Sequence, residues 1–432
     1  VHFVLNTFTD REWGDGREDP ALFNPADFDA RQWARVLRQA GMKLVVLTAK
    51  HHDGFCLWPS RRTGHSVRRS PWRRGRGDVV REVAAACRAE GLRFGIYLSP
   101  WDRHEPAYGD SPAYNRFYRA QLRELLTGYG PVDEVWFDGA CGEGPNGKKQ
   151  VYDWPSYYRV VRELQPRAVI SGMAPDVRWV GTESGIGRET EWSVLPLALP
   201  GLPAAFPGKG PNPLDAVFVP RDLTVADLGG RDRLAAASLL AWYPAEADVS
   251  IRPGWFHHPA EDDRVKTPEE LADLYFQSVG RNAVLLLNVP PDRRGRIAEA
   301  DIRSLLGMRT ILDATFRTDL AAGAAVTASS EAAGHEAAAV THSKAGEYWT
   351  TPDGVETAWL ELDLGPPAVF DCVLLQEAIQ AGQRVEQFRL EAWQESGWEA
   401  VARGTTVGYK RLLRFDPVTA SLYDTSTLGL VS

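Results

Sequence analysis

Short apolar runs alternate with amphipathic helical segments from the start of the chain to residue 315, and this alternation limits the possible folds more than any other feature. Runs with β character lie at 42–55, 92–102, 132–139, 167–172, 177–183, 246–251 and 282–290. Helical periodicity precedes most of them, at 30–41, 77–91, 115–130, 154–166, 232–243 and 268–280. Such alternation indicates a parallel sheet covered by helices. It predicts a (β/α)8-type barrel, with a doubly wound sheet as the alternative. No G-x-G-x-x-G follows a predicted strand, which disfavours a nucleotide-binding sheet.

The length of 432 residues exceeds what one hydrophobic core usually serves, so we predict two domains. After the helical stretch at 299–316, short alternating pieces separated by turn residues replace the β–α repeats. That pattern is typical of an antiparallel β-sandwich. We therefore predict a barrel-like domain at 1–315 and a β-sandwich at 316–432. The final stretch, 418–432, is short and polar, and we expect it to leave the sandwich incomplete or atypical at its end.

Charge and composition exclude several classes of function. The net charge of −8 gives no general support to a nucleic-acid or anionic-membrane partner. No stretch approaches the roughly 20 consecutive apolar residues of a membrane span. The four cysteines, Cys56, Cys87, Cys141 and Cys372, are widely scattered, which favours buried free thiols over disulfides or a zinc site. The chain begins at Val1 without Met; a removed leader and a truncated start would both look like this, so no compartment is indicated.

Residues 195–232 form a Pro- and Gly-rich segment without periodicity. Loops of that length within a compact domain are usually functional or disordered. We predict a long loop over the mouth of the barrel.

Polar side chains follow the apolar runs at several points along the chain. They are His51, His52, Asp53, Ser99, Trp101, Asp102, Asp138, Glu183 and Asn288. The C-terminal ends of parallel barrel strands converge on one face, where such enzymes place their sites. These residues therefore indicate one shared pocket rather than a set of independent turn caps.

Asp138 ends the apolar run Val135, Trp136, Phe137 and precedes a glycine. Out of context, an Asp before Gly at a strand end is a turn residue. Glu183 has a similar setting, and two carboxyl groups at one barrel mouth are the minimal equipment for glycoside hydrolysis. Spacing alone does not single out this pair. The competing carboxylates are Asp53, Asp102, Asp176, Glu191, Glu246 and Asp248.

The run "KHHDGF" at 50–55 permits a metal site as an alternative. With His2, the residues His51, His52 and Asp53 would supply zinc ligands, although the paired H-x-H of barrel metallohydrolases is absent from the first run. Hydrogen bonds from these histidines to substrate hydroxyls are the favoured interpretation, and we expect no metal or organic cofactor. Trp side chains near strand ends suit stacking on sugar faces. These are Trp58, Trp101, Trp179, Trp192 and Trp255.

Seven motifs in order give the chain a specific resemblance. They are "VHFVLNTFTDREWGDG", "LVVLTAKHHDGFCLWPS", "FGIYLSPWDRH", "VDEVWFDGA", "DVRWVGTESG", "EADVSIRPGWF" and "SVGRNAVLLLNVPPDRRG". Together they resemble the α-L-fucosidases of glycoside hydrolase family 29 over roughly residues 1–315. The resemblance implies a barrel-like catalytic domain and a retaining mechanism. "REWGDG" and "RWVGTE" resemble the subgroup that acts on α-1,3/4-linked fucose of Lewis-type glycans, which implies a fucosylated oligosaccharide or glycoconjugate as substrate. The tail resembles the discoidin-type sandwich often attached to these enzymes.

The resemblance also implies roles for individual residues. Asp138 matches the nucleophile, and Glu183, 45 positions further on, matches the acid/base. Matches to substrate-binding positions are His2, His51, His52, Trp58 and Tyr97, with Trp255 beside the sugar's methyl group and Glu246 and Asp248 toward a neighbouring sugar. Two positions depart from the family pattern, Val4 for a glycine and Thr182 for an asparagine. They leave open the alternative of a fucose-binding protein with impaired turnover.

Overall fold

The computed structural model describes residues 1–198, 225–235, 237, 239–342, 344, 346–394, 397–424 and 428–429. The predicted loop at 195–232 falls largely on 199–224, outside the described residues. At its edges the chain forms strand β6 (Val194–Ala198) and the short helix α6 (Arg231–Ala235).

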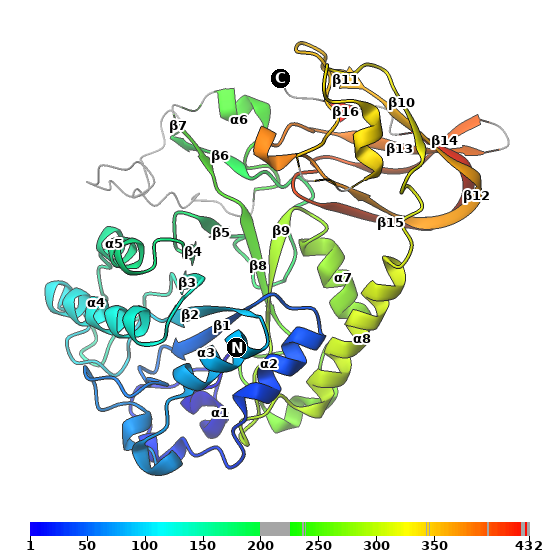
Figure 1. The fold of residues 1–432 in the computed structure, drawn as a ribbon. Coiled ribbons are helices and arrows are strands. Elements are labelled where there is room, and N and C mark those ends of the chain that lie inside the picture. Colours follow the sequence, from blue (N-terminus) through cyan, green and yellow to red (C-terminus); the bar gives the residue numbers. More distant parts are fainter. Residues whose placement is uncertain are drawn as a thin grey trace.

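A seven-stranded parallel sheet forms the centre of the larger domain (Figure 1). Its strands are β1 (Leu44–Lys50), β2 (Arg93–Leu98), β3 (Glu134–Phe137), β4 (Val169–Gly172), β5 (Val177–Trp179), β8 (Ala245–Ser250) and β9 (Ala283–Asn288). They lie in the order β1-β2-β3-β4-β5-β8-β9, and every pairing is parallel. Each strand falls within a run predicted from the sequence, except that β8 begins one residue earlier than its run. Strands β1, β2, β3 and β8 are mostly buried, as expected for a sheet with both faces covered, whereas β9 is mostly half-buried.

Six long helices surround the sheet (Figure 1). They are α2 (Ala30–Gln39), α3 (Val79–Ala89), α4 (Ser111–Gly128), α5 (Trp154–Leu164), α7 (Pro268–Ser278) and α8 (Glu299–Thr315). An aspartate caps the N-terminus of each of the first four, at Asp29, Asp78, Asp110 and Asp153, and accepts a backbone N–H of the first turn. Thr267 and Glu270 form a capping box on α7. These side chains satisfy donors that a helix start otherwise leaves unpaired, and so fix where the helices begin.

The first residues lie between the two edge strands of the sheet. The Val1 nitrogen is 2.8 Å from the Val46 carbonyl oxygen on β1, and the Val1 carbonyl accepts from the Thr48 N–H. His2 contacts Asn288 at the end of β9. This stretch therefore occupies the gap between β9 and β1 and gives the sheet its barrel-like closure. After this stretch, Leu5–Thr9 form helix α1.

The prediction of one helix over 232–243 was wrong in its second half. Only Arg231–Ala235 is helical, and β7 (Leu239–Trp242) pairs antiparallel with β6. Burial from Leu240 to Tyr243 alternates, with Leu240 and Trp242 exposed and Ala241 and Tyr243 buried. A period of two residues suits a strand, and the partner β6 lies too far back in the sequence to be recognised from it.

Beyond α8 the chain forms an antiparallel β domain. One sheet has the order β10-β12-β15-β13-β14 and a two-stranded sheet joins β11 to β16. The strands are β10 (Ala325–Ala328), β11 (Thr357–Ala358), β12 (Leu360–Leu375), β13 (Phe388–Gln394), β14 (Gly397–Gly404), β15 (Arg411–Asp424) and β16 (Leu428–Gly429). Contrary to the expectation for 418–432, residues 418–424 continue β15 along β12.

Short 3-10 helices complete the described elements. They are η1 (Pro20–Leu22), η2 (Val67–Arg69), η3 (Trp72–Gly75), η5 (Pro259–Arg264), η6 (Ala337–Thr341) and η7 (Ile379–Ala381).

Each part of the chain has its own hydrophobic core. The large cluster joins the barrel strands to the inner faces of the helices, through residues such as Leu47, Ile96, Val135 and Leu305. A smaller cluster in the antiparallel part is built on Ala337, Leu360, Leu362 and Leu390. The large cluster also includes Leu412 of β15, so the C-terminal domain packs against the core of the barrel. All four cysteines are free; Cys56 and Cys87 are buried as expected, whereas Cys141 and Cys372 are half-buried.

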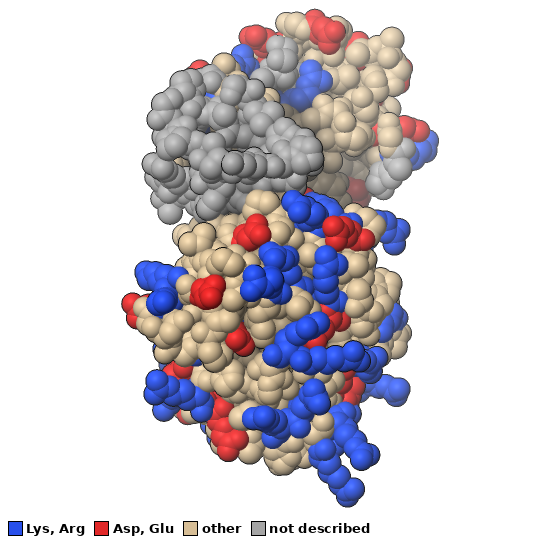
Figure 2. Space-filling view, turned by 90° about the vertical axis from the view of Figure 1, so that its left-hand side faces the viewer, with Lys and Arg blue, Asp and Glu red and all other residues tan. Residues whose placement is uncertain are grey.

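Charge is unevenly distributed over the surface. The barrel face shown in Figure 2 carries many Lys and Arg side chains and fewer acidic ones. Exposed arginines on α4 and α5 include Arg116, Arg123, Arg159 and Arg162. Because the net charge is −8, the negative excess lies elsewhere on the chain. No helix in the described ranges is long and apolar enough to cross a membrane.

Candidate active site

Polar side chains from widely separated parts of the chain meet at the C-terminal ends of the barrel strands. The His2 ring lies 5.6 Å from His51, 5.9 Å from Tyr97 and 5.2 Å from Trp255, between ring centroids. His51 and His52 lie 4.1 Å apart by the same measure. Thus five of the predicted site residues form one cluster, here called the His2 cluster: His2, His51, His52, Tyr97 and Trp255.

Asp138 lies directly after β3 and faces this cluster. Its Oδ2 accepts a 2.6 Å hydrogen bond from the Tyr97 hydroxyl, and its Oδ1 accepts the Ala140 N–H at 2.6 Å. The Asp138 side chain is 23% exposed, so an oxygen remains open to a ligand. The turn role therefore holds in part, because Oδ1 caps the Asp-Gly-Ala turn, but Oδ2 is bound by a side chain of the neighbouring strand. Burial and the negative charge of Asp138 raise the pKa of Tyr97 well above its usual value, so Tyr97 stays a donor.

The hydrogen bonds of Ser99 define the tautomer of His52. Ser99 donates its hydroxyl proton to the Trp101 carbonyl at 2.7 Å, so it can only accept from His52 Nδ1, which lies 2.7 Å away. Burial lowers the pKa of His52, opposed by the charge of Asp138. In the neutral ring, Nε2 is therefore an acceptor, and it lies 3.8 Å from Asp138 Oδ2. A hydroxyl group placed beside these two acceptors has a partner for its proton.

Asn288, at the end of β9, defines the tautomer of His2, as Ser99 does for His52. The Asn288 amide donates to Ser250 Oγ at 3.0 Å and to the Trp255 carbonyl at 2.8 Å, and its oxygen lies 2.9 Å from His2 Nδ1. His2 therefore donates through Nδ1 and keeps Nε2 free of a proton. Burial lowers the pKa of His2 to about 3, so the ring is neutral at ordinary pH.

His51 is buried, and its Nδ1 has no hydrogen-bond partner among the residues that the structure describes. Burial and the neighbouring histidines lower its pKa well below the usual value. An unpaired buried polar atom costs stability, and a native structure that retains one often does so for function. Three neutral histidines with open nitrogens suit hydroxyl groups of an uncharged ligand.

Glu183 lies beyond β5, in an exposed position. Its Oε2 accepts from the Trp255 indole N–H at 3.3 Å. Trp255 is thus the link between Glu183 and His2. The backbone N–H of Trp255 donates to Glu12 at 2.6 Å, which fixes the loop that carries the indole.

Two further carboxyl groups, Glu246 and Asp248, lie on β8 beneath the mouth. Glu246 accepts from the Trp136 indole N–H and Asp248 from that of Trp179, each at 2.6 Å. Burial raises the pKa of Glu246 well above its usual value and that of Asp248 to about 7. The negative charges of both Glu183 and Asp138 also raise the pKa of Asp248. Asp248 therefore lies within electrostatic reach of both proposed catalytic carboxyl groups.

Trp58 is placed apart from the His2 cluster. It is 2% exposed, and its indole N–H donates to Glu124 of α4 at 2.8 Å. No ring contact between Trp58 and the cluster occurs in the described ranges. Its predicted contact with the sugar stays a prediction.

The other carboxylates weighed from the sequence have structural partners. Asp53 accepts the Phe55 N–H in a turn, Asp102 forms a buried 2.9 Å ion pair with Lys50, Asp176 pairs with Arg162, and Glu191 pairs with Arg178. Asp138 and Glu183 are the two whose side chains reach the His2 cluster.

No three His, Cys, Asp or Glu side chains in the described part of the chain are placed to hold a metal ion together. The placement of His2, His51, His52 and Asp53 therefore gives no support to the zinc alternative.

Sequence reasoning missed some residues that hold the site and assigned another a different role. Trp136 was missed, and Trp179 was predicted to stack on a sugar, whereas both donate to the β8 carboxyl groups. Alternation along β3 and β5 was the signal that could have placed them inward. Glu12 had no such signal, because it lies 243 positions from Trp255.

A parallel barrel-like sheet with two reachable carboxyl groups, neutral histidines and a Trp at its carboxyl end defines a glycoside hydrolase. The family model for α-L-fucosidase matches residues 8–180, and that for the F5/8 type C domain matches 325–423.

Individual relatives extend the match over nearly the whole chain. A rice protein (Oryza sativa subsp. japonica) provisionally assigned as α-L-fucosidase 1 is 46% identical over 424 residues, 97% of this chain and 77% of that protein. α-L-fucosidase 1 of Arabidopsis thaliana is 42% identical over 426 residues, 96% and 78% of the two chains. A Ruminococcus gnavus family 29 fucosidase, solved with fucose, superposes with a TM-score of 0.87 at 33% identity, over 100% of this chain and 88% of that one. The chain therefore belongs to glycoside hydrolase family 29, the α-L-fucosidases, a retaining family that hydrolyses terminal fucose.

Proposed function

We propose that Asp138 is the nucleophile and Glu183 the acid/base of this fucosidase. The observation that carries the proposal is the Asp138 carboxylate, held by Tyr97 and the Ala140 N–H while facing the His2 cluster. A nucleophile must be fixed near the anomeric carbon, and both hydrogen bonds restrain the carboxylate without covering it.

The reaction then runs in two steps. Asp138 attacks the anomeric carbon while the bond to the leaving oxygen breaks, and Glu183 gives that oxygen its proton. The product of this step is a fucosyl ester on Asp138. Glu183, now a carboxylate, takes a proton from water as the water attacks the same carbon and releases Asp138. Two inversions give fucose with its original configuration.

The His2 cluster supplies the fucose-binding surface in this proposal. The open nitrogens of His2, His51 and His52 accept or donate hydrogen bonds to sugar hydroxyls, and Trp255 provides an apolar face for the methyl group. Glu246 and Asp248 are proposed to reach a neighbouring sugar, and Trp58 to contribute to the fucose pocket. We also propose 1–315 and 316–432 as the domain limits.

We further propose that the substrate is α-1,3/4-linked fucose on branched, Lewis-type oligosaccharides. The sequence "RWVGTE" around Glu183 supports this. The two departures from the family pattern lie away from Asp138: Val4 is fully buried in the barrel core, and the Thr182 hydroxyl contacts Ser184.

One assay tests activity and linkage together. The protein is incubated with a 4-nitrophenyl α-L-fucoside, a Lewis trisaccharide and an α-1,2-fucosylated lactose. We expect fucose release from the trisaccharide at a kcat/KM at least about tenfold above that for the α-1,2 linkage. Equal or reversed preference would contradict the linkage proposal, and fucose binding without release from any substrate would favour the binding-protein alternative.

A further inference from the structure

The segment that carries Glu183, residues 180–193, runs from the end of β5 to the start of β6 and is here called the acid/base segment. Glu183 is exposed, and its side-chain hydrogen bond to Trp255 is 3.3 Å long. Such a contact fixes a carboxyl group weakly. The position of Glu183 therefore depends on how the backbone of its segment is held.

Two glycines anchor the middle of the segment. The Gly185 N–H donates to the Asp248 carbonyl at 2.9 Å, and the Gly187 N–H donates to the Gln277 carbonyl at 2.8 Å. Gly185 has φ +74°, and a Cβ there would lie 2.6 Å from the Val249 side chain. Glycine permits this close approach, but it also leaves the backbone freer than other residues do. The position of the acid/base segment therefore depends on further contacts, which lie at residues 188–193.

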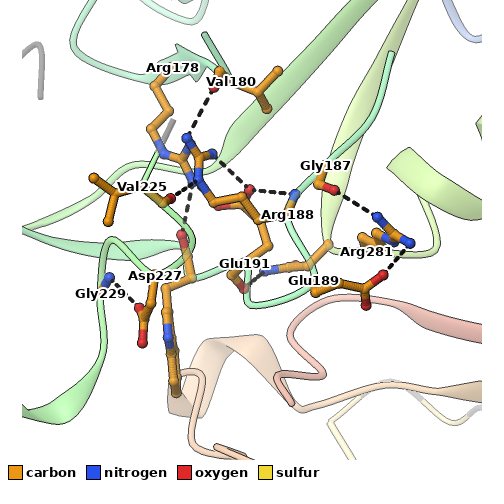
Figure 3. Close-up of polar contacts among 12 residues, drawn as sticks. Arg178, Val180, Gly187, Arg188, Glu189, Glu191, Val225, Asp227, Gly229 and Arg281 are labelled. Atoms are coloured by element: carbon orange, nitrogen blue, oxygen red, sulfur yellow. Dashed lines mark hydrogen bonds and ion pairs between the residues drawn. The ribbon is translucent and has the colours of Figure 1, made fainter. Parts of the chain in front are cut away.

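On the barrel side, a buried group of ion pairs centred on Glu191 makes these contacts. The Glu191 carboxylate is 1% exposed and pairs with both Arg178 of β5 and Arg188. Figure 3 shows that Arg188 also donates to the Val180 and Val225 carbonyls, and that Arg281 donates to the Gly187 carbonyl and pairs with Glu189.

The C-terminal β domain closes on the same residues from the other side. The Glu191 N–H donates to Thr406 Oγ1 at 2.9 Å, and the Glu191 carbonyl accepts from Gln383 at 2.8 Å. The Ser193 N–H donates to the Gln383 side chain at 2.8 Å. The Glu189 carbonyl accepts from Thr405 at 2.7 Å and from Arg411 at 2.8 Å. Every one of these contacts reaches the segment's backbone, so the domain determines where the backbone lies.

The loop that makes these contacts is itself fixed to the barrel. Asn282, just before β9, donates to the Lys410 carbonyl at 3.0 Å and accepts the Tyr409 N–H at 2.8 Å. The Leu412 N–H donates to the Gly280 carbonyl at 2.9 Å. Asn282 adopts φ +59° and also donates to the Glu191 carbonyl. These hydrogen bonds fix the C-terminal domain to the barrel next to the residues that contact the acid/base segment.

We propose that Gln383, Thr405, Thr406 and Arg411 of the C-terminal domain are positioning residues for Glu183. The inference rests on the proposed role of Glu183 as acid/base. Proton transfer requires hydrogen-bond distance to the leaving oxygen, and small displacements reduce the rate steeply. These four residues are here called the clamp. Loss of the Thr406 hydroxyl from the clamp leaves the buried Glu191 N–H unpaired, and the backbone of the acid/base segment is then free to shift. The C-terminal domain is then part of the catalytic apparatus without touching the substrate.

The test compares leaving groups. Fluoride departs from fucosyl fluoride without general-acid help, whereas the sugar of a fucosyl disaccharide needs a proton from Glu183. kcat/KM reports the steps up to and including the first irreversible one, which is formation of the fucosyl ester. In that step only the disaccharide depends on Glu183 as an acid. The variants are Thr406→Val and Gln383→Ala, with Thr327→Val, exposed on β10, as the matched control and Glu183→Ala as the reference.

We expect Thr406→Val and Gln383→Ala each to lower kcat/KM for the disaccharide by about tenfold or more and that for the fluoride less than about threefold. Thr327→Val should change neither. Equal losses on both substrates, or no loss in either clamp variant, would overturn the proposal. If Glu183→Ala itself loses both activities equally, the acid/base role of Glu183 fails instead. Thermal unfolding shows whether each clamp variant is folded. If one of the two folds poorly, the other still tests the proposal.

Discussion

The Tyr97 hydroxyl donates a 2.6 Å hydrogen bond to Oδ2 of Asp138, from the neighbouring strand of the barrel. A hydrogen bond to a charged group contributes about 1.5–3 kcal/mol. We therefore expect Tyr97→Phe to lower kcat/KM by roughly 10- to 150-fold, since the carboxylate loses the side-chain contact that orients it. Steady-state kinetics with an aryl fucoside measures the effect.

Tyr118→Phe is the matched control. The Tyr118 hydroxyl is also buried, but it donates to the Leu98 carbonyl at 2.6 Å and not to Asp138. Its loss should cost about 1–3 kcal/mol of stability, because the Leu98 carbonyl loses its partner, and leave kcat/KM within about twofold. Equal activity losses in the two variants would show that Tyr97 acts through folding alone.

His51→Leu should separate stability from ligand binding. Nδ1 of His51 is buried without a partner in the described part of the chain, so its removal should cost the free enzyme little stability, whereas a sugar hydroxyl would lose its contact. We expect the Ki for fucose to rise by about tenfold or more, with a thermal midpoint lowered by only a few degrees. His335→Leu, in the C-terminal domain, is the control for fucose affinity. An unchanged Ki in His51→Leu would remove His51 from the fucose site.

Asp248→Asn should stabilise the protein in a pH-dependent way. Burial raises the pKa of Asp248 from 3.8 to about 7, so folding takes up a proton between these values. The free energy of unfolding of the wild type therefore falls as pH rises through this window, by up to about 1.4 kcal/mol per pH unit. The uncharged Asn of the variant does not titrate, so the variant escapes this loss. Denaturant unfolding at pH 4 and pH 8 should show the variant gaining about 4 kcal/mol in free energy of unfolding relative to wild type on going to pH 8.

Asp263→Asn, at an exposed position, serves as the comparison and should change stability by less than about 0.5 kcal/mol at both pH values. An Asp248→Asn effect that is the same at pH 4 and pH 8 would mean that the carboxyl group is already ionised in the folded protein across this range.

Local pattern predicted the barrel strands well. Apolar runs gave all seven strands of the parallel sheet, and the polar residues after them identified His51, His52 and Asp138 as neighbours. Strand β7 was missed because its partner β6 lies at the start of the segment 195–232, which has no periodicity, so that no local pattern in the partner marked the pair as strands.

The parts of the site that escaped prediction depend on contacts between distant positions. Glu12 fixes the Trp255 loop from 243 positions away, and Thr406 binds Glu191 from 215. Neither residue lies in a pattern with a period, and neither is marked by composition. Pairings of this kind follow from the packed fold rather than from any local signal.

The covalent intermediate tests the central claim most directly. The protein is incubated with a 2-deoxy-2-fluoro-fucosyl fluoride, digested and analysed by mass spectrometry, with Asp138→Asn as the control. The account predicts one added fluorofucosyl group on the peptide that carries Asp138, and no label in the control. A label on Asp248, Glu183 or another residue of the wild type would contradict the assignment of Asp138 as the nucleophile.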